Sequence, residues 1–346
     1  MQISSLDLDL RTESAARRSL RPTRRSFLTI TAVAGGLLAV GASLDLAPPR
    51  GQTIVRQERM LMGTLIHLAV VSPNARRGQE AIDVTFAAMQ RLIAIFDARR
   101  PDSTLSQLNR AGAVAHPPAE FTQLLQLALT ISAQSRGAFD VTVQPVLDAR
   151  RSGEDDLNPA LALVDYHRLH VDGDSVRLDS PGMAVTLDGL AKGRVIDEAV
   201  ASLRELGYDH VLVEAGGDLA GRGQRADATP WRVGVAHPRQ SGNLLSTLDI
   251  TDAALATSGD YMNYLAQDFS AHHIVDPRTG MSPAELAGVT VMAPTAALAD
   301  ALSTALMVLG IDQGTALLTH WPDTSALFVT KSMAQVPTDG FPMTLG

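Results

Sequence analysis

The apolar segment over residues 295–310 contains two polar side chains whose spacing indicates a ligand site. Its sequence is Thr-Ala-Ala-Leu-Ala-Asp-Ala-Leu-Ser-Thr-Ala-Leu-Met-Val-Leu-Gly, so a helix formed by it should be buried. Asp300 and Thr304 are four residues apart and therefore lie on one face of that helix. A buried carboxylate is costly unless it is paired or bound to a metal, and a carboxylate with a hydroxyl oxygen suits a hard cation such as Mg²⁺. The alternative is that Asp300 meets a buried arginine and Thr304 bonds back to its own helix.

A second segment, residues 187–194, has the composition of an anion site. Small residues in Leu-Asp-Gly-Leu-Ala-Lys-Gly-Arg open a predicted helix, and the free N–H groups of a helix start bind anions such as phosphate. Lys192 adds a cation within the first turn. The segment is not a phosphate loop, because that motif needs Ser or Thr directly after the lysine. An ordinary strand-to-helix turn is the alternative.

Four shorter motifs carry weaker signals for binding or catalysis. His272 and His273 precede the turn sequence Asp-Pro-Arg-Thr-Gly and could supply a base or a ligand, although a lone histidine is more often structural. Gly-Ala-Phe-Asp at 137–140 follows a predicted helix and could cradle a ring or simply end that helix. Gly-Gly-Asp at 216–218 and Met-Gly-Thr at 62–64 are compatible with plain turns.

The composition is that of an acidic, cysteine-free protein large enough for a substantial core. The chain has 346 residues, of which 45% are hydrophobic, enough for one large domain or two small ones. Its net charge is −8, and because the first 42 residues hold six arginines against three acidic residues, the remainder carries −11. Such a chain is a poor candidate for binding nucleic acid, which needs clustered cations. The absence of cysteine excludes disulfides, thiolate metal sites and a cysteine nucleophile.

Residues 1–47 read as a targeting segment rather than as part of the fold. Arg24 and Arg25 precede Ser-Phe-Leu, and an uncharged, moderately apolar stretch follows over residues 27–42. That stretch is short for a membrane span, and its charged start and small-residue end are typical of a signal peptide. The paired arginines predict twin-arginine export to the periplasm, with cleavage after Ala42 or Ala47. The alternative is a short uncleaved anchor, which would give inner-membrane association.

The remaining residues, 48–346, alternate between helical and extended patterns in an order that favours an α+β fold. Apolar residues recur at helical spacing in four segments: 78–97, 118–135, 190–206 and 295–309, the last ended by Gly310. Extended patterns occur around 65–70, in two short strands within 158–180 and over 210–214, 231–236, 245–250 and 324–330. The strands cluster as meanders and the helices do not alternate strictly with them. We therefore expect a mixed, mainly antiparallel sheet with packed helices rather than a doubly wound parallel sheet.

Taken in order, seven of these segments resemble the motifs of the ApbE family of FAD:protein FMN transferases. The resemblance runs from about Met60 to Gly310, and each motif is weak alone but the ordered set is specific. The matching segments are 62–64, Asp102–Asn109 (Asp-Ser-Thr-Leu-Ser-Gln-Leu-Asn), 137–140, 188–193, 215–219 (Ala-Gly-Gly-Asp-Leu), 273–280 (His-Ile-Val-Asp-Pro-Arg-Thr-Gly) and 299–310.

The resemblance implies a single ApbE-like domain and a Mg²⁺-dependent transfer of FMN from FAD to a threonine of an acceptor flavoprotein, with release of AMP. It implies that Asp300 and Thr304 ligate Mg²⁺ together with the backbone carbonyl of Gly189. His273 is the candidate general base, and Asp300 the second candidate catalytic residue. The residues implied to contact or support FAD are Met62, Phe96, Ala138, Phe139, Asp140, Lys192, Asp218 and a residue at His272 or His273. The implied acceptors are exported subunits of ion-pumping quinone reductases and related electron-transfer proteins.

Three positions depart from the family's pattern. Asp188 replaces the usual glycine, Arg194 replaces the usual tyrosine, and Phe96 stands where a tyrosine is common, but none of these changes removes a proposed ligand. Two other functions use the same residues: a Mg²⁺-dependent FAD pyrophosphatase, with water as nucleophile, and an exported FAD-binding protein. A nicotinamide oxidoreductase is disfavoured because no Gly-x-Gly-x-x-Gly loop follows an early strand.

Overall fold

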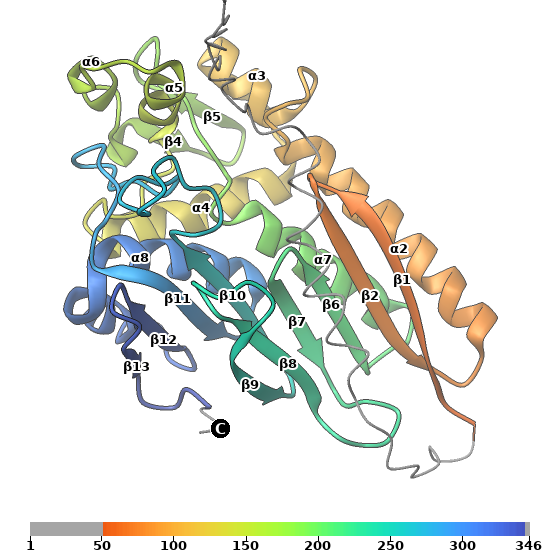
Figure 1. Cartoon of the computed structure of the whole chain (residues 1–346). Coiled ribbons are helices and arrows are strands. Elements are labelled where there is room, and N and C mark those ends of the chain that lie inside the picture. Colours follow the sequence, from red (N-terminus) through yellow and green to blue (C-terminus); the bar gives the residue numbers. More distant parts are fainter. Residues whose placement is uncertain (1–50, 343–346) are drawn as a thin grey trace, which may run out of the picture.

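The computed structural model describes residues 51–342, which form a layered α+β structure (Figure 1). Its central sheet has eight strands, and each neighbouring pair is antiparallel. In spatial order the strands are β1 (Thr53–Leu61), β2 (Thr64–Ser72), β6 (Val211–Ala215), β7 (Asp218–Arg222), β10 (Ala253–Gly259), β11 (Leu286–Ala293), β12 (Ser325–Thr330) and β13 (Gln335–Pro337). This arrangement confirms the predicted fold class. The predicted targeting segment, residues 1–47, lies outside the described residues.

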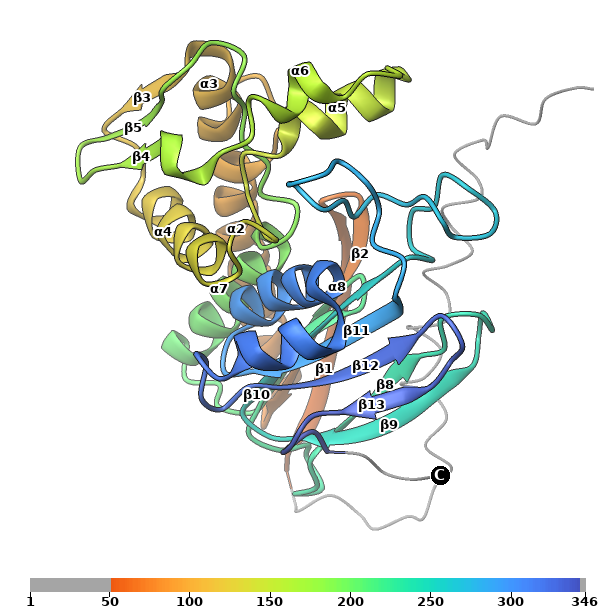
Figure 2. The same cartoon turned by 90° about the vertical axis from the view of Figure 1, so that its left-hand side faces the viewer.

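Helices cover one face of the sheet (Figures 1 and 2). Three of them, α2 (Ala75–Phe96), α7 (Ala191–Glu205) and α8 (Ala296–Leu318), pack on strands, and α4 (Ala119–Gln134) packs against α8. Helix α2 begins where the Asn74 side chain accepts the N–H of Arg77, and its apolar residues at helical spacing, among them Ile82, Phe86 and Met89, are fully buried. The four predicted helices are therefore present.

Helix α8 is buried on nearly every side, because β10, β11 and α7 surround it. Among the residues that the structure describes, it is the one helix long and apolar enough to cross a membrane, and much of it lies in the core. The prediction that this helix ends at Gly310 is only partly correct. Gly310 adopts a left-handed φ of 75° and breaks the helix, but helical backbone resumes to Leu318. The Glu285 carboxylate accepts the N–H of Ile311 at 3.3 Å and so supports this second start.

The opposite face of the sheet is covered by a hairpin of β8 (Trp231–Ala236) and β9 (Leu244–Ile250), which Figure 2 shows beneath the strands. Residues of β8 alternate strictly between buried and exposed, as expected for a strand with one apolar face. Trp231 and Ile250 of the hairpin belong to one buried apolar cluster with Leu219 and Leu255 of the sheet. Because both faces are covered, the central strands bury nearly all of their side chains.

A smaller cap of short elements lies beyond the helices, at the top of Figure 2. Its elements are α3 (Thr104–Ala111), β3 (Ala113–Ala115), α5 (Gln144–Ser152), α6 (Asn158–Leu161), the 3₁₀ turn η2 (Tyr166–Arg168), β4 (Leu169–Val171) and β5 (Ser175–Leu178). The three strands pair in the order β3-β5-β4. The two predicted short strands within 158–180 are thus β4 and β5.

Candidate functional site

Each of the helices α7 and α8 supplies a carboxylate that accepts N–H groups from the first turn of the other helix. Asp300 of α8 accepts the N–H of Gly193 in α7 at 3.1 Å. Asp197 of α7 accepts the N–H groups of Ala296 and Ala297 in α8 at 2.8 and 2.9 Å. The two helices approach closely because position 193 lacks a side chain: a Cβ there would lie 2.2 Å from the carbonyl oxygen of Ala296. The first turns of the two helices are therefore held in one fixed relation.

Lys192 lies in the same first turn of α7 and is paired with a buried carboxylate. Its ammonium is 2.7 Å from Asp218 at the start of β7, and Asp218 is only 2% exposed. The other oxygen of Asp218 accepts the N–H of Thr257 at 3.2 Å. Burial opposes the charge of Lys192, but Asp218 and Asp300 outweigh it and raise the pKa of the ammonium above its ordinary value. The site therefore holds a permanent cation next to a helix N-terminus, the arrangement that binds phosphate.

The surroundings of Asp300 disfavour the ionised form of its carboxyl group. Burial raises its pKa well above the ordinary value, and repulsion from Asp218 and Asp188 adds to the effect, while Lys192 and the Gly193 N–H oppose it. A nearby divalent cation would relieve this penalty, because opposite charge favours the ionised form. Within the described residues, only Oδ2 of Asp300 accepts a hydrogen bond.

The other oxygens of the site suit the same kind of ion. Gly189 is packed against Thr304, since a Cβ on Gly189 would lie 3.2 Å from the Thr304 hydroxyl. That hydroxyl is 3.3 Å from the hydroxyl of Ser258 on β10. No three His, Cys, Asp or Glu side chains in residues 51–342 converge on a metal position, so a cation would depend on mixed oxygen donors. Carboxylate, hydroxyl and backbone carbonyl oxygens fit a hard cation, and Mg²⁺ binds proteins through few carboxylates.

His273 lies on the long loop that joins β10 to β11, where the charge of Lys192 acts on its ring. His273 is an exposed residue, yet the protein packed around its ring lowers its pKa to about 4, with charge repulsion from His272 and Lys192 adding to the effect. The ring is therefore neutral at pH 7 and able to accept a proton. His272 is fully buried instead: its N–H donates to the hydroxyl of Ser282, its Nε2 is 3.3 Å from the Pro283 carbonyl oxygen, and its Nδ1 has no partner in the described chain.

The remaining predicted residues divide between the site and the surrounding structure. The Phe139 ring lies against Gly189, where a Cβ would be 3.1 Å away. Ala138 is buried beside Phe139, and Met62 adopts a positive φ of 52° in the β1–β2 turn. Phe96 is 3% exposed and belongs to the main core at the end of α2.

The carboxylate of Asp140 accepts hydrogen bonds from its own loop and from the turn η2. It accepts hydrogen bonds from the N–H and hydroxyl of Thr142 at 2.8 and 2.7 Å and from the N–H of Tyr166 at 3.0 Å. These bonds tie the Gly-Ala-Phe-Asp turn to η2 and so position the Phe139 ring. The structure thus assigns this carboxylate a local structural task in addition to its predicted place near FAD.

Sequence reasoning missed Asp197 and Ser258, both of which support the site. A signal for Asp197 exists in the sequence: the first turn of α8 contains no acidic residue, so its free N–H groups need an acceptor from elsewhere. Nothing in the sequence indicates that the acceptor lies almost a hundred residues earlier. Ser258 hydrogen bonds to Ser303 at 2.9 Å and thus links β10 to α8, a contact that only the fold reveals.

Together, these observations describe an α+β protein in which carboxylate, hydroxyl and carbonyl oxygens gather near a lysine at a helix N-terminus. The model of the ApbE family matches residues 62–328, and the chain belongs to this family.

Relatives and solved structures agree with that assignment. The FAD:protein FMN transferase of Salmonella typhimurium is 30% identical over 314 residues, covering 83% of this chain and 88% of the relative. That of Haemophilus influenzae is 28% identical over 305 residues, covering 80% and 87%. The apo form of the Pseudomonas stutzeri flavinyl transferase ApbE superposes with a TM-score of 0.75 at 28% identity, covering 86% of this chain and 98% of that one. The flavin transferase ApbE of Vibrio cholerae gives 0.74 at 25% identity, covering 85% and 100%. The resemblance drawn from the motifs is confirmed, and the chain is an enzyme of the transferase class.

Proposed function

We propose that this protein transfers FMN from FAD to a threonine hydroxyl of an acceptor flavoprotein and releases AMP. The names of its relatives support the transfer of FMN from FAD to protein. The observation that carries the finer proposal is the meeting of Lys192, Asp300 and Thr304 at the crossing of α7 and α8. This is a site for a pyrophosphate and a cation together.

Each side chain has a definite task in this reaction. Lys192 and the N-terminus of α7 bind the pyrophosphate of FAD, since both present positive charge. Asp300, Thr304 and the carbonyl of Gly189 would hold Mg²⁺, which when bound supplies neutralisation of phosphate charge. Phe139 lies beside this position and offers an aromatic surface to the flavin part of the substrate.

The transfer requires one group that accepts the proton of the threonine hydroxyl. The threonine oxygen attacks the phosphorus of the FMN half, the bond from that phosphorus to the bridging oxygen breaks, and AMP leaves with that oxygen. The hydroxyl proton goes to His273, which is neutral at pH 7 because its pKa is lowered to about 4. Phosphate charge bound at Lys192 would raise that pKa and so make the imidazole a better base. Most of the rate enhancement would come from positioning and charge neutralisation.

The proposal is tested by intact mass of a threonine-bearing flavoprotein domain incubated with the enzyme, FAD and Mg²⁺. We expect a gain of one FMN, which is lost when Mg²⁺ is chelated. An Asp300→Asn variant should lose transfer by about a hundredfold or more, because the carboxylate ligand is gone. Asp312→Asn is the matched control, since Asp312 is exposed on the second segment of α8.

The other outcomes are informative in different ways. Normal turnover by the Asp300→Asn variant would show that the metal site is wrong. FAD cleaved to FMN and AMP without a mass gain would identify a pyrophosphatase, and intact FAD bound tightly would identify a flavin-binding protein.

We also propose that the enzyme acts in the periplasm after twin-arginine export and that its acceptors are exported electron-transport flavoproteins. The basis is the pair Arg24–Arg25 ahead of an apolar stretch. A site that binds FAD through a folded helix crossing suits an export route that carries folded proteins.

A further inference from the structure

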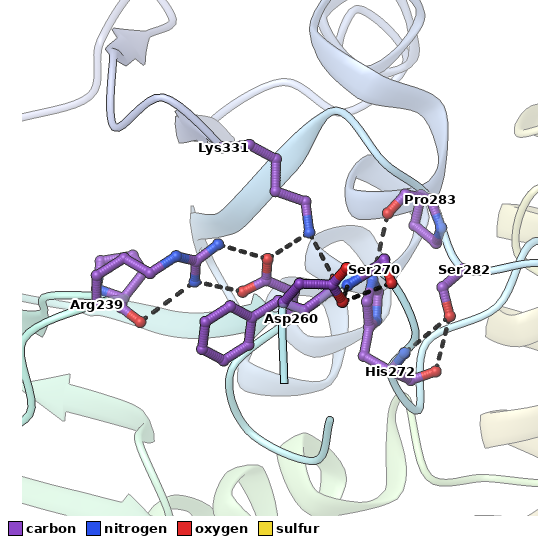
Figure 3. Close-up of polar contacts among 10 residues, drawn as sticks. Arg239, Asp260, Ser270, His272, Ser282, Pro283 and Lys331 are labelled. Carbon is purple, nitrogen blue, oxygen red and sulfur yellow. Dashed lines mark hydrogen bonds and ion pairs between the residues drawn. The ribbon is translucent and has the colours of Figure 1, made fainter. Parts of the chain in front are cut away.

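The loop between β10 and β11, residues 260–285, is fixed at its base by one buried carboxylate and two cations, drawn in Figure 3. Asp260 follows β10 directly and has no exposed surface. Both of its oxygens accept from the Arg239 guanidinium at 2.7 Å, and one also lies 2.5 Å from the Lys331 ammonium. Such a two-pronged arginine–carboxylate pair is geometrically demanding and strong.

The two cations come from different parts of the chain and both reach beyond Asp260 to the loop itself. Arg239 lies between β8 and β9, and Lys331 directly follows β12. Lys331 donates to the carbonyl of Phe269 at 2.9 Å, and the Arg239 guanidinium lies over the Phe269 ring, 4.3 Å from its centroid. A cluster that served only to join the strands would not need these contacts with the middle of the loop.

The first half of the loop, residues 261–271, contains no buried residue, whereas the second half is held by buried side chains such as Ile274 and Val275 and by a hydrogen bond from Arg150 to the carbonyl of Gly280. Three of its large apolar side chains, Met262, Tyr264 and Leu265, are 38%, 52% and 67% exposed. A segment with few buried apolar contacts opens easily unless other bonds fix it. Lysine is also scarce in this chain, with two lysines against 27 arginines, and both lysines contact a buried aspartate.

Hydrogen bonds inside the loop connect the fixed point to the site. The N–H of Leu265 donates to the carbonyl of Ala271 at 2.7 Å, and the N–H of His273 donates to that of Asn263 at 3.0 Å. These bonds close a small hairpin that contains Phe269 at one end and His273 at the other. Displacement of Phe269 would therefore displace His273, four residues later.

We propose that Arg239, Asp260 and Lys331 form a positioning cluster that holds the 260–285 loop and so fixes the place of His273. The three residues act through the loop and touch no substrate. The inference rests on the proposed function in one respect, namely that His273 accepts the threonine proton.

The test compares Arg239→Met with Arg232→Met. Both arginines belong to the β8–β9 hairpin and bind an aspartate through two nitrogens, but the Arg232–Asp249 pair is exposed and its hydrogen bonds within the described residues do not involve the loop. We expect Arg239→Met to raise hydrogen exchange of peptides over 261–281 about tenfold, and Arg232→Met to leave it unchanged. Transfer by Arg239→Met should fall in kcat about 10- to 100-fold, with FAD affinity changed less than about threefold.

A second readout follows His273 without any turnover. The ring signal of His273, assigned in NMR spectra by its loss in His273→Gln, should stay that of a neutral imidazole between pH 5 and 8 in the wild type, because its pKa is lowered to about 4. In Arg239→Met the ring should titrate closer to the ordinary histidine value of about 6.5. In Arg232→Met it should behave as in the wild type.

The possible results distinguish a failure of the cluster from a failure of its positioning role. Unchanged exchange over 261–281 in Arg239→Met overturns the cluster, and raised exchange with unchanged kcat and unchanged His273 titration overturns its positioning role. If Arg239→Met fails to fold, Lys331→Met and Lys331→Arg replace it, with the arginine expected to retain the loop and the methionine to release it. If the wild type transfers no FMN, the proposed function is wrong. Hydrogen exchange over 261–281 and the titration of the His273 ring still test the positioning role of the cluster.

Discussion

At the scale of single residues, Gly193 is where the two helices of the site approach most closely. A Cβ at this position would lie 2.2 Å from the backbone oxygen of Ala296, and backbone cannot move aside as a flexible side chain can. We expect Gly193→Ala to lower the free energy of unfolding by about 1–3 kcal/mol, as overpacking does. The variant should also lose most transfer activity, because Lys192 and Asp300 would be pushed apart.

Gly173→Ala provides the control for that prediction. Gly173 lies in the β4–β5 turn with an ordinary φ, and a Cβ there would meet nothing within 4 Å. We expect it to change stability by less than about 0.5 kcal/mol. Urea unfolding of the two variants checks both values, and an equal loss in both would show that the close approach is not what makes position 193 sensitive.

The sequence predicted the placement of the candidate residues correctly where the relevant spacing was local. The four-residue interval of Asp300 and Thr304 placed both on one face of a helix, and Lys192 was marked by its place in a helix start. Asp218 was visible only as a turn residue, because its partner Lys192 lies in another element. The hydrogen bonds that occupy Asp140 could not be foreseen either, since Tyr166 is 26 residues away.

At the scale of elements, the start of α8 depends on a carboxylate from α7. Asp197 accepts two of its free N–H groups, and the Thr295 side chain accepts a third, that of Leu298, at 3.3 Å. We expect Asp197→Ala to cost about 1–3 kcal/mol, because two buried N–H groups lose their acceptor. The shift of α8 should also raise the Mg²⁺ concentration needed for half-maximal transfer.

Glu205→Ala is the comparison, because Glu205 is an exposed residue at the end of the same helix. Chemical unfolding and a Mg²⁺ titration of transfer measure both effects. The idea that Asp197 sets the relation of the two helices fails if the two variants behave alike.

The elements that the sequence predicted are those with one apolar face. Strand β8 alternates between buried and exposed residues, and its predicted bounds, 231–236, are the observed ones. Strands β10 and β11 were missed because they are covered on both faces, so that Leu286–Ala293 is buried at nearly every position and shows no alternation. Helix α3 was missed because only Leu105 and Leu108 of its eight residues are buried, too few to produce a helical period.

At the scale of the whole molecule, the topology lies beyond what the sequence patterns could give. Strand β7 pairs with β10 across the entire β8–β9 hairpin, and α7 meets α8 across about a hundred residues. Local periodicity carries no information on such pairings, which long-range packing decides. The ordered motifs nevertheless implied the family, because their order along the chain is specific although each motif is weak alone.

The last prediction concerns the destination of the whole protein. The segment 21–28, Arg-Pro-Thr-Arg-Arg-Ser-Phe-Leu, should direct folded enzyme to the twin-arginine route, where the arginine pair is read as such and not merely as charge. Changing Arg24 and Arg25 to lysine keeps the charge, and we expect enzyme to accumulate in the cytoplasm. The same change at Arg17 and Arg18, a second arginine pair that lacks the Ser-Phe-Leu sequence, should leave export intact. Cell fractionation with an antibody to the enzyme measures both, and the flavin content of a periplasmic acceptor should follow the enzyme. If the Arg24–Arg25 variant is exported normally, another route carries the protein, and the proposed twin-arginine export is wrong.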